Sequence, residues 1–305
     1  MNGIINVYKE KGFTSHDVVA KLRGILHMKK IGHTGTLDPD AVGVLPVCLG
    51  KGTGLVSMIT DWTKTYEAVM LLGTTTDTQD TSGTVLTRSE VNVDERTVLE
   101  VCSQFEGEYD QIPPMYSALK VNGKKLYELA RAGIEVERKP RKVVINSLRV
   151  NDISLEDDVK TVTITVDCSK GTYIRTLCED IGKKLGCGAC MMSLKRTRVG
   201  EFVIDDTLTL NQIAALALKG EIQDYIVGID KMFPDYRKLT IDDSYNKLLY
   251  NGNKLPLEAV AEENGEILDM EKFRIYDSCD DFVGIYKYIG GQLVPEKMFY
   301  EKSVT

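Results

Sequence analysis

Two segments of alternating hydrophobicity constrain the fold of this chain more than any other sequence feature. In residues 64–72, apolar side chains fall on every second position from Tyr66 to Leu72, and residues 161–168 alternate in the same way. Side chains of a β-strand point to opposite faces in turn, so a period of two predicts strands that bury one face. Helical patterns lie around both segments, and the combination predicts an α+β fold.

The helices are indicated by their ends as well as by their periodicity. Thr14 followed by Asp17 resembles a capping box, and apolar residues then recur at helical spacing as far as Leu26. Similar patterns predict helices over residues 94–105, 126–131, about 176–185 and 208–219. Gly186 and Gly220 follow the last two, as glycines commonly do at helix C-termini.

The length of 305 residues is typical of about two domains. A break falls at residues 233–236, and short β-like runs such as residues 282–288 follow it. We therefore expect a larger domain over residues 1–235 and a small β domain over residues 236–305. No stretch approaches eighteen uninterrupted apolar residues, and no cleavage-site pattern follows the N-terminus, so we expect a cytoplasmic protein without a membrane span.

The segment from Gly32 to Gly54 is rich in glycine, threonine and proline, which predicts a long ordered loop rather than regular structure. Asp38 lies within it, five residues after His33. A carboxylate on such a loop can approach a substrate closely and act as a nucleophile or general base. The alternative is an Asp-Pro turn in which the carboxylate accepts backbone hydrogen bonds, and spacing alone favours this alternative.

Three further residues could serve chemistry: Tyr66, Tyr173 and Arg175. If the chain stays extended after residue 168, Tyr173 and Arg175 point to the same side. Tyrosines on strands are more often half-buried core residues than catalysts. Taken singly, therefore, none of the three establishes a site.

Charge is unevenly distributed along the chain. The net charge is −7, yet residues 116–149 hold nine basic and three acidic side chains. Within this region, residues 111–141 form a polar, basic insertion that includes Lys120, Lys124 and Lys125. Segregated charge of this kind can present a basic face to a polyanion, although solvated helix faces would give the same pattern.

Metal and nucleotide sites have little support. The chain has three histidines, and Cys187 and Cys190 form a single CxxC pair with no second pair to complete a zinc set. Residues 50–54 resemble a phosphate-binding loop only loosely, since no G-x-x-x-x-G-K-[ST] motif occurs. We expect no metal and no nucleotide.

Five blocks of sequence, in order, resemble one known family. They include the segment from Gly32 to Pro46 around Asp38, residues 64–67 and 76–78, residues 111–127, and residues 168–177 with 185–189. Together they are similar to the TruB family of bacterial tRNA pseudouridine synthases. The tail more weakly resembles the small RNA-binding β-barrel, of PUA type, that ends many members.

The resemblance implies a mixed, largely antiparallel sheet flanked by helices, and a cofactor-free isomerase. Its substrate would be the T-loop uridine of tRNA at position 55, flipped out of its stack and rejoined to the sugar through carbon 5. Asp38 matches the essential aspartate, Tyr66 the tyrosine that stacks on the base, Tyr173 the tyrosine that handles the proton, and Arg175 the partner of the aspartate. His33 matches a histidine that supports the T-loop, and Lys9 and Leu194 match positions that support the pocket.

The basic insertion matches the family's mobile thumb, with Lys120, Lys124 and Lys125 facing RNA. The resemblance leaves open whether Asp38 attacks the sugar or the base. It implies a stand-alone cytoplasmic monomer that needs no guide RNA, whereas the alternatives are a non-catalytic RNA-binding module and a guide-dependent synthase. Glu10 stands where the family usually has proline, and Cys190 stands where relatives often have histidine.

Overall fold

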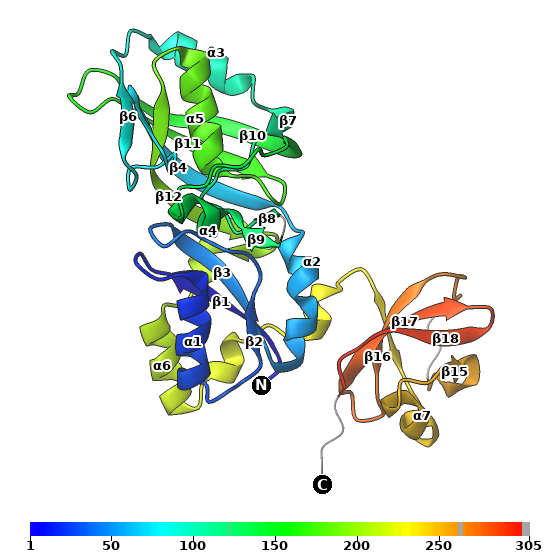
Figure 1. The fold of residues 1–305 in the computed structure, drawn as a ribbon. Coiled ribbons are helices and arrows are strands. Elements are labelled where there is room, and N and C mark those ends of the chain that lie inside the picture. The colour runs from blue at the N-terminus through cyan, green and yellow to red at the C-terminus, as the bar shows by residue number, and fades with distance from the viewer. Residues whose placement is uncertain (122, 262–264, 301–305) are drawn as a thin grey trace.

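The computed structural model describes residues 1–121, 123–261 and 265–300, and the fold is organised around two separate sheets (Figure 1). The larger sheet has nine strands, seven of them in the order β1-β3-β12-β4-β11-β10-β7, with β2 beside β3 and β13 beside β12. Its strands are β1 (Gly3–Lys9), β2 (Ile31–His33), β3 (Val42–Leu49), β4 (Lys64–Leu72), β7 (Gly107–Gln111), β10 (Arg141–Ser154), β11 (Thr161–Cys168), β12 (Ala189–Val199) and β13 (Phe202–Val203). Its described pairs are antiparallel except for β3 and β12, which run parallel.

All helices but the last lie along this sheet and in its connections, and the last packs against the smaller sheet. They are α1 (Ser15–Ile25), α2 (Val56–Thr60), α3 (Glu95–Ser103), α4 (Leu126–Arg131), α5 (Ile174–Leu185), α6 (Leu210–Lys219) and α7 (Asn246–Tyr250). Short 3₁₀ turns cover Gly50–Leu55, Ile204–Asp206, Ile222–Tyr225, Ile229–Met232, Asp243–Tyr245 and Leu257–Ala259. Among the described residues, no helix is long and apolar enough to cross a membrane.

The alternating segments form the centre of the larger sheet, as predicted. β4 and β11 have the expected bounds and pair with each other. Their inward side chains form one core with α3 and α5, which cover the same face of the sheet (Figure 1). The fold is thus the expected mixed, largely antiparallel sheet flanked by helices.

A second core lies under α1 and α6, against β1 and β3. The capping box of Thr14 and Asp17 is present, with both reciprocal hydrogen bonds formed. Gly186 and Gly220 end their helices in the left-handed conformation. The end signals in the sequence are therefore confirmed at these helices.

Two sequence expectations are wrong. The segment from Gly32 to Gly54 is not a continuous loop, because it contains the buried strand β3 and a 3₁₀ turn. The chain is not extended through Arg175, because α5 begins at Ile174 and Tyr173 is its N-cap residue. Short, fully buried apolar runs interrupted by glycine and proline carry little periodicity, so the sequence pattern does not predict β3.

The smaller sheet has five strands in the order β14-β16-β17-β18-β15 and curls on itself. These strands are β14 (Arg237–Thr240), β15 (Leu255–Pro256), β16 (Lys272–Tyr276), β17 (Phe282–Ile289) and β18 (Gln292–Met298). The predicted β run at residues 282–288 lies in β17. The remaining strands form two hairpins outside both sheets: β5 (Thr74–Thr76) with β6 (Val85–Arg88), and β8 (Lys120–Val121) with β9 (Lys124–Lys125).

Candidate active site

Asp38 lies on the loop between β2 and β3, where its carboxylate meets the guanidinium of Arg175. The Arg175 Nε lies 2.9 Å from Oδ2, and its Nη2 donates to Oδ1 at 3.4 Å. The Asp38 side chain is 40% exposed and that of Arg175 only 6%. The turn hydrogen bond at this point is accepted by the main-chain oxygen of Asp38, from the Ala41 N–H at 3.1 Å. The carboxylate is therefore held by a buried cation and open to a substrate.

Arg175 reaches Asp38 from the first turn of α5. Its guanidinium also donates to the carbonyl oxygens of Thr78 at 3.0 Å and Tyr116 at 2.8 Å, and lies 3.8 Å from the carboxylate of Asp80. One side chain thus connects the Asp38 loop, the turn after β5 and the start of the basic insertion.

Tyr173 is held at its backbone by a side chain from β7. The Gln111 Oε1 accepts from the Tyr173 N–H at 2.7 Å, and Nε2 donates to the Tyr173 carbonyl at 3.0 Å. Burial raises the pKa of the Tyr173 phenol, and the nearby charges of Arg141 and Arg175 oppose that rise. The Tyr173 phenol is therefore protonated near neutral pH. The sequence included Gln111 in a matching block but gave no sign of this role.

Tyr66 lies on β4 within the core that also holds Leu37 and Leu194. Its exposure is 9%, and burial raises the pKa of its phenol. Leu194, on β12, is 8% exposed. These two side chains give the candidate site an apolar boundary.

Lys9 and His33 both form hydrogen bonds with the backbone of the Asp38 loop. The Lys9 Nζ is fully buried and donates to the carbonyls of Ala41 at 2.6 Å and Pro39 at 3.0 Å. Burial lowers the pKa of Lys9 to about 8. The His33 Nδ1 accepts from the Gly35 N–H at 3.4 Å, and burial, aided by the charge of Arg196, lowers its pKa. Lys9 makes its contacts although Glu10 replaces the usual proline.

The basic insertion forms the β8–β9 hairpin followed by α4, as the sequence predicted for residues 126–131. Lys120 and Lys124 are exposed, whereas the Lys125 Nζ lies 3.2 Å from the Tyr127 hydroxyl. Residue 122 of the predicted insertion lies outside the described residues.

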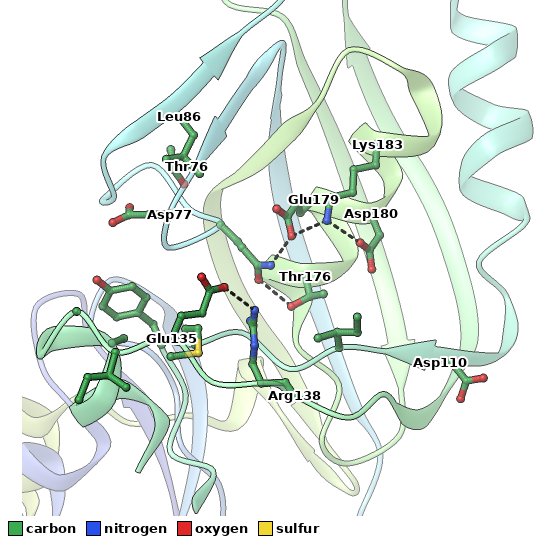
Figure 2. Close-up of a pocket in the computed structure, with 17 residues that line it drawn as sticks. Thr76, Asp77, Leu86, Asp110, Glu135, Arg138, Thr176, Glu179, Asp180 and Lys183 are labelled. Carbon is green, nitrogen blue, oxygen red and sulfur yellow. Dashed lines mark hydrogen bonds and ion pairs between the residues drawn. The ribbon is translucent and has the colours of Figure 1, made fainter. Parts of the chain in front are cut away.

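A cavity of about 650 Å³ separates the insertion from the turn after β5 and from α5 (Figure 2). Glu179 and Asp180 point to Lys183, and Glu135 to Arg138, on its walls. The Thr176 hydroxyl donates to Gln79 at 2.8 Å, and Gln79 donates to Glu179. Most charges that line the cavity are therefore paired with each other.

Within the described part of the chain, no three histidine, cysteine or acidic side chains lie close enough together to bind a metal ion. Cys187 and Cys190 are buried free thiols. Burial raises the pKa of both, to about 11 for Cys190. The CxxC spacing is thus part of the packing between α5 and β12.

Comparisons with known proteins agree with this arrangement. Residues 23–174 match the sequence model of the TruB family pseudouridylate synthase N-terminal domain, and residues 175–233 match the tRNA pseudouridylate synthase B C-terminal domain. A tRNA pseudouridine synthase B of Lachnoclostridium phytofermentans is 53% identical over 94% of this chain and 95% of its own length. The protein of that name from Clostridium acetobutylicum is 43% identical over 93% of this chain and 95% of its own length.

Solved structures with the same fold include an H/ACA RNP bound to a substrate RNA that contains 2′-deoxyuridine. It matches with a TM-score of 0.68 and 28% identity over 98% of this chain and 86% of that one. An archaeal box H/ACA sRNP Nop10-Cbf5 complex matches with a TM-score of 0.66 and 28% identity over the same shares. On its two family matches and its near full-length relatives, the chain belongs to the TruB family of pseudouridine synthases.

Proposed function

We propose that this chain is a tRNA pseudouridine synthase that isomerises the T-loop uridine at position 55. The observation that carries the proposal is the Asp38 carboxylate, open to solvent and bound by the buried Arg175 at 2.9 Å. A protein that only binds RNA has no need of a carboxylate fixed in this way. Membership of the family and the names of the full-length relatives support the substrate.

The reaction breaks the bond between uracil N1 and ribose C1′ and joins C1′ to C5. The C5 proton leaves, and N1 gains a proton. Asp38 supplies the carboxylate that attacks the sugar or the base, and Arg175 orients it through their ion pair. Flipping the uridine costs a few kcal/mol, which stacking on Tyr66 offsets by about 1–3 kcal/mol. Tyr173, a phenol beside Arg175, is placed to handle the proton.

The other residues complete the pocket and the RNA surface. His33 supports the T-loop from the end of β2, while Lys9 and Leu194 support the loop and the wall of the pocket. Lys120, Lys124 and Lys125 meet phosphates, because they place positive charge on the hairpin that follows the Tyr116 contact with Arg175. Residues 1–235 form the catalytic domain, and residues 236–305 form a PUA-like RNA-binding domain of which 262–264 and 301–305 lie outside the described residues.

The enzyme acts alone as a cytoplasmic monomer, with no guide RNA and no cofactor. The structural neighbours in H/ACA assemblies suggest the alternative of a guide-dependent synthase. The basic insertion favours the stand-alone enzyme, since it provides an RNA-contacting surface within the chain itself.

The test is release of tritium from tRNA transcripts labelled at uridine C5, with metal chelated and no guide RNA or nucleotide added. The proposal predicts about one equivalent released per tRNA, and none from a transcript in which position 55 is cytidine. No release by folded protein that binds the same tRNA would contradict it and favour a binding module. Release only after guide RNA is added would support the guide-dependent alternative.

A further inference from the structure

Arg196, on β12, is a buried cation that the proposed chemistry does not use. It is 1% exposed and forms no salt bridge with any carboxylate in the described residues. Burying a charge is costly unless hydrogen bonds replace its water. The contacts of this guanidinium therefore call for an explanation.

Two of those contacts are carbonyl oxygens at the two ends of the Asp38 loop, and a third partner is the Tyr66 phenol. The Arg196 Nη2 donates to Gly35 at 3.3 Å, before Asp38, and Nε donates to Val44 at 2.8 Å, after it. Lys9 bonds Pro39 and Ala41 between these points. Four carbonyls of one short segment thus receive hydrogen bonds from two buried cations.

The position of Arg196 in the sheet is equally specific. It pairs with Gly43 across the parallel contact of β12 with β3, and with Tyr66 across the antiparallel contact of β12 with β4. Gly43 has a φ of +106°, and a Cβ there would lie 2.2 Å from the Arg196 carbonyl oxygen. Only glycine permits this approach. Arg196 therefore stands where the strand after the Asp38 loop meets the strand that carries Tyr66.

We propose that Arg196 is a positioning residue for the isomerisation, because its guanidinium fixes both ends of the segment from Gly35 to Val44 and so sets Asp38 against Arg175 and Tyr66. Arginine suits this role because its planar fork directs several N–H groups to separate acceptors, which the single ammonium of lysine does not reproduce. The catalytic meaning of the inference rests on the proposed function. The fixing of the loop can be measured without turnover.

The first experiment compares Arg196→Lys with Arg198→Lys as a matched control. Arg198 lies two residues further along β12 but bonds Thr65 and Asp167, away from the Asp38 loop. We expect Arg196→Lys to lower the single-turnover rate on saturating tRNA at least tenfold while the Kd for tRNA stays within about threefold. We expect Arg198→Lys to retain the wild-type rate. A wild-type single-turnover rate in folded Arg196→Lys would overturn the proposal. Weaker tRNA binding with an unchanged rate would overturn it as well.

The second experiment is amide hydrogen exchange of the same full-length variants without RNA. Loss of the two hydrogen bonds should speed exchange in residues 35–41 of Arg196→Lys and leave β4 and β11 protected as in the wild type. Uniformly faster exchange across the chain would indicate a general structural role for Arg196. Unchanged exchange in the loop would show that Arg196 does not fix it. Either result would overturn the inference. Hydrogen exchange also tests the inference when Arg196→Lys is too unstable for the turnover assay, since exchange reports on the loop and the sheet separately.

The two proposals fail in different ways. If wild-type protein bound tRNA without releasing tritium, the proposed function would fail. The exchange comparison would still show whether Arg196 fixes the loop. If the wild type turned over and Arg196→Lys matched it, only the role of Arg196 would fail.

Discussion

At the scale of single residues, the candidate site combines an accessible carboxylate with buried groups that hold it in place. Asp38 is open, whereas Arg175, Lys9 and Arg196 are at most 5% exposed as residues. Each buried cation donates hydrogen bonds to oxygen atoms of the loops around Asp38. Little reorganisation is then needed when the base arrives, which is how preorganised groups favour a reaction.

The titration of His33 tests this electrostatic arrangement. Burial and the positive charge of Arg196 place its pKa below the ordinary 6.5. The imidazole should therefore be neutral at pH 7. Because the unfolded chain binds this proton more readily, the stability that His33 contributes should decline as pH falls below 6.5 and be lost as pH falls through the lower folded-state pKa.

NMR titration of the three histidines measures this pKa, with His33→Gln to assign the signal. We expect the His33 signal to titrate below 6.5. A value at or above 6.5 in the folded protein would contradict the burial and the charge that the structure places around it.

The sequence could indicate some of these residues but not others. Asp38, Tyr66, Tyr173 and Arg175 stand in motifs, and the structure brings Asp38 and Arg175 together. Tyr173 and Arg175 do not extend to one side of a strand, because Arg175 belongs to a helix. Gln111 and Arg196 act across 62 and 161 residues of sequence, and no local pattern encodes contacts of that separation.

At the scale of elements, the root of the basic insertion is tied to the start of α5. Gln111 ends β7 and bonds both backbone groups of Tyr173, and Tyr116 accepts from Arg175. The β8–β9 hairpin and α4 follow directly. A movement of the insertion on RNA would therefore be transmitted to the ion pair of Asp38 and Arg175.

Neutralising Lys120, Lys124 and Lys125 together to glutamine should weaken tRNA binding and flatten its salt dependence. Each lost phosphate contact reduces the slope of log Kd against log salt by about 0.7, so the change should be at most about 2. Filter binding at several salt concentrations measures it. The matched control is Lys184, Lys219 and Lys231 changed to glutamine, all exposed and outside both the insertion and the proposed RNA-binding domain. Equal slopes for both triple variants would show that the insertion does not meet RNA.

Elements with strong local signals could be predicted from the sequence. The alternating hydrophobicity of residues 64–72 and 161–168 predicts β4 and β11, and the capping box predicts the start of α1. β3 could not be found in this way, because it is buried on both faces and pairs with β12, far away in the sequence. α5 begins two residues before the position that the sequence pattern predicts. Its N-cap residue, Tyr173, makes no capping hydrogen bond with its own side chain and is held instead by a distant glutamine.

At the scale of the whole molecule, the smaller sheet shares a core with the larger part of the chain. Ile285 and Phe299 belong to the same buried cluster as Leu55 and Ile59. The Tyr276 hydroxyl donates to Asp230 at 2.9 Å across the break that the sequence indicated. These contacts indicate that the two parts unfold together rather than as independent units.

Phe299→Ala should therefore destabilise the whole protein by about 3 kcal/mol or more, as expected for removal of a buried phenylalanine. The single tryptophan, Trp62, packs in the same cluster, so its fluorescence in urea reports on this core while circular dichroism reports on the whole chain. Leu268→Ala, at a 61% exposed position, is the control and should change little. Separate transitions for the two probes in the wild type would contradict a shared core.

The central claim is that the Asp38 carboxylate performs the isomerisation, and Asp38→Asn tests it most directly. Asp40→Asn is the matched control, since Asp40 lies exposed on the same loop. Tritium release from C5-labelled tRNA should be abolished in Asp38→Asn and retained in Asp40→Asn. Binding of tRNA by Asp38→Asn should stay within about tenfold of the wild type, or about 1.4 kcal/mol. Full release by a verified Asp38→Asn preparation would contradict the account.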